Sequence, residues 1–119
     1  MRIFAIEDDP MLLRILQRIL APYDAQVRVF DDPLSAIAQA RTEAPDLVVT
    51  DYHLPNLDGI DTLIEIQRIH PAVKTLLLSA ALSDEKITHA LKDRVVFRFV
   101  TKPWKRTELE AAIADLAKA

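Results

Sequence analysis

Short apolar runs alternate along the chain with segments in which apolar residues recur at helical spacing. Most of these runs are near-continuous, which is typical of strands buried on both faces of a sheet. The runs are Ile3–Ile6, Val27–Phe30, Leu47–Thr50, Thr75–Leu78 and Val96–Val100. They predict five strands.

The segments after these runs are amphipathic and predict five helices. Their apolar stripes run over residues 12–20, 34–38, 60–64, 87–91 and 109–116. Asp9-Pro10 and Asp32-Pro33 each pair a capping carboxylate with a proline in the first turn, which indicates two helix N-termini. Asp58-Gly59 precedes the third helix.

Strict alternation of strands and helices predicts a parallel sheet with helices on both faces. Crossovers in such a sheet are right-handed, and ligands bind beyond the carboxyl ends of the strands. The chemistry of the protein is therefore expected at that edge of the sheet.

Polar side chains follow four of the five expected strands. They are Glu7, Asp8 and Asp9 after the first, Asp51 after the third, Ser79 after the fourth, and Lys102 with Pro103 after the fifth. The second strand is followed only by Asp31 and Asp32. Because the carboxyl ends of parallel strands share one edge, these side chains are expected to lie together.

Carboxylates gathered around Asp51 repel one another and raise one another's pKa unless a cation neutralises them. A few carboxylates with water suit Mg²⁺ best. An aspartate beside bound Mg²⁺ can attack phosphorus and form an aspartyl phosphate. Lys102 can neutralise charge on the transferred group, and the Ser79 hydroxyl can donate a hydrogen bond to it.

Each of these residues also has an ordinary structural interpretation. Acids after strands are often helix caps, and we favour that interpretation for Asp9 and Asp32. A cap explains only one member of the adjacent pair Glu7 and Asp8. The coincidence of the whole set at four strand ends favours a site.

Composition narrows the class of protein. The 119 residues fit one compact domain, and a net charge of -3 gives no sign of a nucleic-acid surface. The absence of cysteine excludes a disulfide framework and a cysteine–zinc site, and fits the cytosol. Acids interrupt the apolar N-terminus at Glu7, and the longest uncharged stretch, residues 75–83, is too short for a bilayer. A cytoplasmic protein without membrane insertion is expected.

Four motifs along the chain together resemble the receiver domain of two-component response regulators. They are Glu7-Asp8-Asp9-Pro10, the run Asp51-Tyr52-His53-Leu54-Pro55-Asn56-Leu57-Asp58-Gly59, Ser79-Ala80 and Thr101-Lys102-Pro103. The resemblance implies a flavodoxin-like, three-layer (βα)5 sandwich with strand order 2-1-3-4-5. It also implies that residues 1–119 form a single receiver domain.

The resemblance carries roles onto matching positions. Glu7 and Asp8 are the acid pair, with Asp8 a direct metal ligand, and Asp51 is the phosphoacceptor. The remaining roles are the His53 backbone carbonyl as a metal ligand, Ser79 as the switch hydroxyl, Lys102 as the phosphoryl-binding lysine, Phe99 as the switch aromatic, and His53 and Ala81 as rim residues.

The family also implies partners. The cofactor is Mg²⁺, with Mn²⁺ as a substitute, and the phosphodonor is a histidine kinase or a phosphotransfer protein. The domain catalyses only its own phosphorylation and dephosphorylation, so it is no conventional enzyme. The signal passes to an output domain or partner through the face of the fourth helix, fifth strand and fifth helix, without direct nucleic-acid contact.

Two departures from the common pattern concern switching. Lys92-Asp93-Arg94-Val95 replaces a small Gly-Ala stretch, and Phe99 stands where tyrosine is usual.

A Ca²⁺-binding EF-hand loop is excluded because Leu54 and Pro55 would occupy its first positions.

Three further functions fit the residues less well than a phosphorylation switch does. A flavin domain is disfavoured by a single glycine in the chain. An aspartate-nucleophile phosphatase would want an acid at His53. A degenerate receiver, used only as an interaction module, would usually have lost the acceptor, the acid pair or the lysine.

Overall fold

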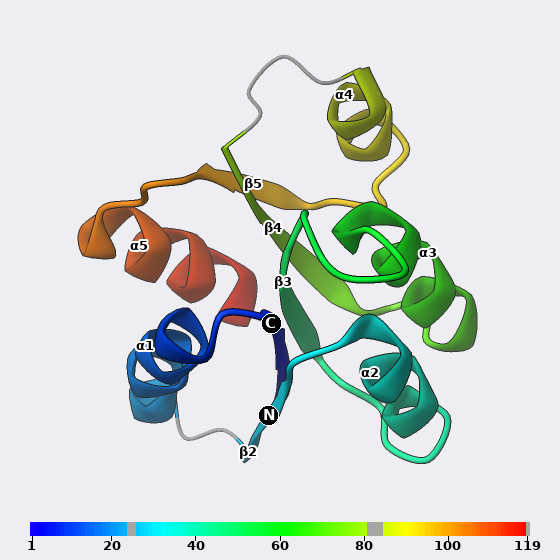
Figure 1. Ribbon diagram of the computed structural model, residues 1–119, viewed down its shortest axis with the longest axis horizontal. Helices are drawn as coiled ribbons and strands as arrows, with labels where there is room; N and C mark the ends of the chain where they lie inside the picture. Colours follow the sequence, from blue (N-terminus) through cyan, green and yellow to red (C-terminus); the bar gives the residue numbers. More distant parts are fainter. Residues whose placement is uncertain (24–25, 81–84, 119) are drawn as a thin grey trace.

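Five parallel strands form one sheet at the centre of a computed structural model that describes residues 1–23, 26–80 and 85–118 (Figure 1). The strands are β1 (Arg2–Ile6), β2 (Gln26–Phe30), β3 (Leu47–Asp51), β4 (Lys74–Ser79) and β5 (Arg98–Thr101). Their order is β2-β1-β3-β4-β5. The predicted flavodoxin-like topology is confirmed.

Helices cover both faces of the sheet (Figure 1). They are α1 (Pro10–Leu20), α2 (Pro33–Ala40), α3 (Gly59–Ile69), α4 (Glu85–Lys92) and α5 (Arg106–Ala117), with a 3-10 turn, η1 (Ala21–Tyr23), after α1. One core cluster joins α1 and α5 to the sheet, and the other joins α2, α3 and α4 to its opposite face. No described helix is long and apolar enough to cross a membrane.

The side chains of β1 explain why its run is apolar throughout. Ile3 and Ala5 belong to the cluster under α1 and α5, whereas Phe4 and Ile6 belong to the cluster under α2, α3 and α4. All four are completely buried. A strand that faces two helical layers has no solvent-facing side on which a polar residue is tolerated.

The edge strand β2 differs from the other four in burial. Its residues are exposed or half-buried, and Val29 is 38% exposed. The apolar run predicted the strand, and the strand order implied by the family resemblance placed it at an edge of the sheet, where fewer neighbours cover it.

The expected helix caps are present. Asp9 Oδ1 accepts a hydrogen bond from the Met11 amide at 2.9 Å, and Asp32 Oδ1 accepts one from the Ser35 amide at 3.0 Å. Both helices have proline at the start of the first turn. Asp9 and Asp32 therefore have the structural role predicted for them.

The fifth strand begins later than predicted. Val96 lies before it, because the amides of Val95 and Val96 both donate to the Ala90 carbonyl at the end of α4. Pairing begins after Phe97, whose amide donates to the Thr75 carbonyl and hydroxyl. Val96 is apolar because it is buried in the core, not because it pairs with β4.

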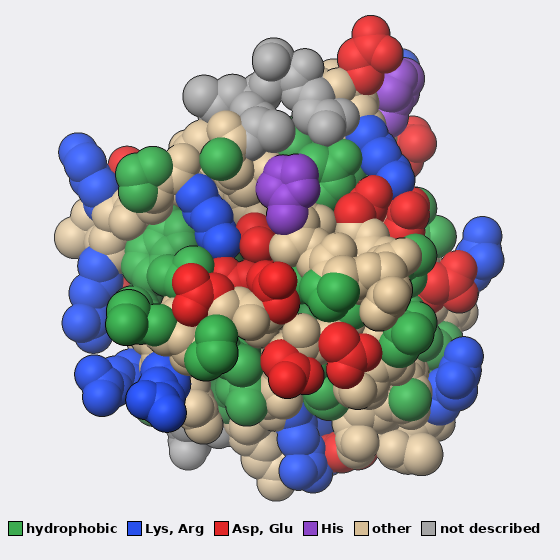
Figure 2. Space-filling model, viewed as in Figure 1, with side chains coloured by type: hydrophobic (Ala, Val, Ile, Leu, Met, Phe, Trp, Pro, Cys, Tyr) green, Lys and Arg blue, Asp and Glu red, His purple; other side chains and the backbone are tan. Residues whose placement is uncertain are grey.

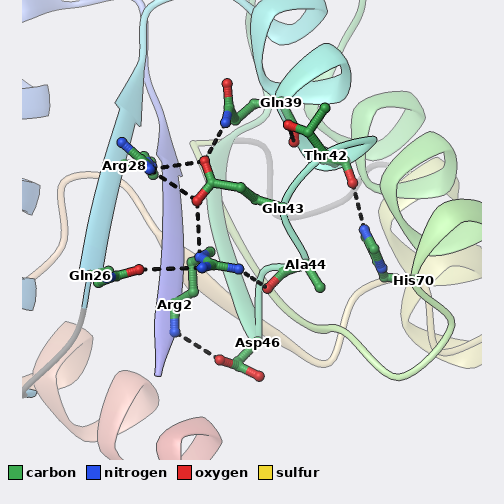
Figure 3. A network of polar contacts seen from close by, with 10 residues as sticks. Arg2, Gln26, Arg28, Gln39, Thr42, Glu43, Ala44, Asp46 and His70 are labelled. Atoms are coloured by element: carbon green, nitrogen blue, oxygen red, sulfur yellow. Dashed lines mark hydrogen bonds and ion pairs between the residues drawn. The ribbon is translucent and has the colours of Figure 1, made fainter.

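A polar network fixes the amino-terminal edge of the sheet, opposite the expected site (Figure 3). Glu43 lies 3.1 Å from Arg2 Nε and 3.0 Å from Arg28 Nη2, so one carboxylate links β1 and β2. His70, half-buried after α3, has its Nε2 2.6 Å from the Ala40 carbonyl at the end of α2. The His70 contact joins the end of α3 to the end of α2, and the Glu43 ion pairs join the segment after α2 to the sheet.

Candidate functional site

Four strand ends converge at the carboxyl edge of the sheet, as the topology requires. Glu7 follows β1, Asp51 ends β3, Ser79 ends β4 and Lys102 follows β5. Figure 2 shows acidic side chains gathered on this face beside a Lys or Arg side chain. The structure therefore brings together residues that lie far apart in the sequence.

Lys102 is the cation at the centre of this group. Its Nζ lies 2.9 Å from Glu7 Oε1 and 3.1 Å from Asp51 Oδ1. Its backbone amide donates to the Ser79 carbonyl at 2.9 Å, which fixes the start of the connection after β5. The side chain is 22% exposed, so the lysine contacts both carboxylates and still reaches solvent.

Burial dominates the electrostatics of Glu7, which is 1% exposed. Burial raises the pKa of Glu7 to about 7, opposed by the Lys102 hydrogen bond and reinforced by the negative charge of Asp51. Burial also acts to lower the pKa of Lys102, but its hydrogen bonds and ion pairs with Glu7 and Asp51 outweigh this, so the pKa is raised. The lysine therefore stays charged between the two carboxylates.

The same carboxylates offer a set of ligands for a metal. One carboxylate oxygen each of Glu7, Asp8 and Asp51 lie within 4.8 Å of one another. Glu7 uses one oxygen for Lys102 and the other to accept from the Asp8 amide at 3.1 Å, whereas the Asp8 side chain is exposed. Hard oxygen donors next to solvent fit Mg²⁺, which keeps several waters.

Gly59 packs directly against the backbone carbonyl of Asp51. A Cβ on Gly59 would lie 2.2 Å from the Asp51 carbonyl oxygen, a distance that no side chain tolerates. The Gly59 amide donates to the Tyr52 carbonyl at 2.7 Å, and Thr50 Oγ1 donates to the Asp51 carbonyl at 3.0 Å. The sequence analysis identified Gly59 as a helix start and as the end of the Asp51–Gly59 motif, but it did not predict this contact with the Asp51 backbone.

The predicted switch and rim residues occupy different environments. Ser79 is completely buried, while Phe99 is half-buried against the core cluster under α2, α3 and α4. His53 is exposed, with its ring centroid 5.0 Å from that of Tyr52. Ala81, the other predicted rim residue, lies outside the described residues.

A parallel sheet with an acid cluster, a buried aspartate and a lysine at its carboxyl edge defines a receiver-like module. The family model for the response regulator receiver domain matches residues 3–114. The chain belongs to this family, which serves two-component signalling and is not a class of conventional enzymes. Receiver domains bind Mg²⁺ in the acidic pocket and pair with histidine kinases and output domains.

Individual proteins agree with this assignment. The transcriptional regulatory protein ZraR of Escherichia coli is 32% identical over 111 residues, which are 93% of this chain but only 25% of that protein. The signal receiver domain of an HD domain-containing protein from Pseudomonas fluorescens has a TM-score of 0.88 at 26% identity, covering 98% of this chain and 86% of that one.

A third protein shows the fold alone. The receiver domain of a sensor histidine kinase from Pseudomonas aeruginosa, solved with a magnesium ion in its active site cleft, has a TM-score of 0.82 at 24% identity. The alignment covers 99% of this chain and 98% of that one.

Proposed function

We propose that Asp51 accepts a phosphoryl group from a histidine kinase or phosphotransfer protein in a Mg²⁺-dependent reaction, and that this switches the surface that contacts an output domain or partner. The observation that carries the proposal is the buried side chain of Asp51, 8% exposed, whose carboxylate lies 3.1 Å from Lys102 Nζ beside two further carboxylates. Residues 1–119 would form one receiver domain acting in the cytoplasm.

The chemistry needs little beyond position and charge. A carboxylate oxygen of Asp51 attacks phosphorus, the bond from phosphorus to the donor atom breaks, and the donor keeps the electron pair. Lys102 neutralises charge on the transferred group, and the Ser79 hydroxyl donates a hydrogen bond to it.

Glu7, Asp8, Asp51 and the His53 backbone carbonyl would hold Mg²⁺, for which Mn²⁺ substitutes. The ion supplies further neutralisation of the phosphoryl oxygens when bound. The domain would catalyse only its own phosphorylation and dephosphorylation. The exposed His53 side chain would lie at the rim of the site and tune the hydrolysis of the phosphoaspartate.

The signal would leave through Ser79 and Phe99. Ser79 ends β4, and it pairs in register with Thr101 of β5. A move of the Ser79 hydroxyl toward the phosphoryl group vacates space beside β5, and the half-buried Phe99 ring can fill that space. Full burial of an exposed phenylalanine contributes about 1.5–3 kcal/mol. Completing the burial of the half-buried Phe99 ring would contribute only the remaining part of this, which biases the face formed by α4, β5 and α5.

Incubation with acetyl phosphate, followed by intact-mass measurement, tests the function. The wild-type protein with Mg²⁺ should gain one phosphoryl group, and EDTA should abolish the gain. Asp51→Asn should remain unlabelled, while Asp31→Asn, a change at an exposed acid after β2, should be labelled normally. Labelling that persists in EDTA or in Asp51→Asn contradicts the proposal.

Beryllofluoride with Mg²⁺, as a stand-in for the phosphoryl group, tests the switch. We expect a change in Trp104 fluorescence and in the NMR shifts of α4, β5 and α5 in the wild type, and a smaller change in Ser79→Ala. If analogue binding leaves these signals unchanged, the route through Ser79 and Phe99 is wrong.

A further inference from the structure

Lys86 joins two helices that the Ser79–Phe99 route does not connect. It lies in the first turn of α4, and its Nζ is 2.7 Å from Asp58 Oδ2 and 3.0 Å from Asp61 Oδ2 at the start of α3. The hydrogen bond to Asp58, opposed in part by burial and supported by the bond to Asp61, raises the pKa of Lys86. The ammonium is therefore charged at every pH at which the protein would act.

Asp58 uses its two carboxylate oxygens for different tasks. Oδ2 accepts from Lys86, while Oδ1 accepts from the Asp61 amide at 2.8 Å and caps α3. The next residue, Gly59, approaches the carbonyl of Asp51 so closely that a Cβ there would clash with it. Asp58 thus contacts α4 through its carboxylate and is bonded to the glycine that packs against the backbone of the proposed phosphoacceptor.

The two sides of this ion pair continue from different strands. Asp58 and Asp61 follow β3, which ends at Asp51, and Lys86 is on the helix that follows β4, which ends at Ser79. A displacement of one strand end relative to the other therefore changes the distances from the ammonium to the two carboxylates. Lengthening these short charge-assisted hydrogen bonds weakens the ion pair.

We propose that Lys86, Asp58 and Asp61 form a latch that couples the position of α4 to the occupancy of Asp51. This coupling rests on the proposed function and acts beside the route through Ser79 and Phe99. An ion pair between α3 and α4 resists their displacement relative to each other, so the latch opposes any displacement of α4 through which the proposed switch acts.

Hydrogen exchange tests the latch without any phosphoryl analogue or metal. The amides of α4 should exchange about two- to fivefold faster in Lys86→Met than in the wild type, as expected for the loss of a half-exposed ion pair. Lys92→Met, a change at the exposed end of the same helix that removes only a favourable charge at the helix C-terminus, should raise exchange less than Lys86→Met does. High salt should reduce the difference between Lys86→Met and the wild type because it screens the pair. Equal exchange in the two lysine variants overturns the latch.

Beryllofluoride affinity in Mg²⁺ tests the coupling. Lys86→Met should bind the analogue about two- to fivefold more tightly than the wild type, and Lys92→Met should bind it equally. Asp58→Asn keeps an oxygen that can cap α3, and it should give part of the gain in beryllofluoride affinity. In the double variant with Lys86→Met, the gain should be smaller than the sum of the two single gains, because both changes break the same ion pair. Unchanged or weaker binding in Lys86→Met overturns the coupling. A wild type that fails to bind the analogue overturns the proposed function and the coupling with it, while the exchange experiment still decides whether the latch exists.

Discussion

At the scale of single residues, Glu7 shows how a site can oppose stability. Its carboxyl is buried beside Asp51, and its pKa is raised from 4.5 to about 7. The folded protein therefore binds this proton more tightly than the unfolded chain does. Ionisation of Glu7 lowers the free energy of unfolding as pH rises from about 4.5 to about 7, and above that range the loss is complete.

The metal-free protein should accordingly lose stability through this carboxyl between about pH 5 and pH 7.5. We expect a decrease of roughly 1–3 kcal/mol in the free energy of unfolding relative to Glu7→Gln, whose side chain does not titrate. Urea unfolding of both proteins in EDTA at the two pH values measures it. If the free energies of unfolding of the wild type and of Glu7→Gln change equally between the two pH values, the ionisation of Glu7 does not destabilise the folded protein.

Gly59 makes a second residue-scale prediction. A methyl group in Gly59→Ala must push away the Asp51 carbonyl, since the contact is with backbone and not with a flexible side chain. We expect a loss of about 1–3 kcal/mol in unfolding free energy, as for other overpacked sites, and slower labelling of Asp51. Asp61→Ala, in the same turn of α3, serves as the control and should lose about 1 kcal/mol at most with its exposed ion pair. Full stability in Gly59→Ala would contradict the close approach.

At the scale of elements, short local signals fix where the helices begin. Asp32 accepts hydrogen bonds from both the amide and the hydroxyl of Ser35, and these bonds lower its pKa. Because the pKa falls on folding, the cap stabilises α2 above the unfolded pKa of the aspartate. This contribution is lost as pH falls through the folded pKa.

Asp32→Ala should therefore cost about 1 kcal/mol at neutral pH, the usual effect of losing an N-cap. Thermal or urea unfolding of Asp32→Ala is compared with that of Asp31→Ala, a change at its exposed neighbour. The comparison separates the loss of the cap from the loss of a negative charge. The difference between the two variants should shrink in acid. Equal stability of the two variants at neutral pH is the contradicting result.

Sequence patterns predicted the elements whose causes are local and missed the features that depend on contacts across the fold. The apolar run of β1 indicated its burial, and Asp9 and Asp32 indicated their helices. The start of β5 was misplaced because Val96 is buried by packing, which an apolar residue cannot distinguish from pairing. The exposure of β2, the contact of Gly59 and the ion pairs of Lys86 depend on which elements become neighbours.

At the scale of the whole molecule, the strand order decides the chemistry. Residues as distant as Glu7 and Lys102 meet because β1, β3, β4 and β5 end at one edge. Their types predicted a site, and the topology supplied its geometry. The starts of α3 and α4 lie at the same edge. Gly59 at the start of α3 packs against Asp51, and the neighbouring Asp58 binds Lys86 of α4, so Asp51 lies close to the face proposed to transmit the signal.

Chemical mapping of the phosphoryl group is the most direct test of this account. The protein is treated with acetyl phosphate and Mg²⁺, reduced with borohydride, which converts an aspartyl phosphate to homoserine, and digested for peptide mass spectrometry. We predict homoserine at Asp51 alone in the treated protein, and none when EDTA replaces Mg²⁺. Homoserine at Asp8 or Asp9, or a treated protein without any homoserine, would contradict the assignment of Asp51 as phosphoacceptor.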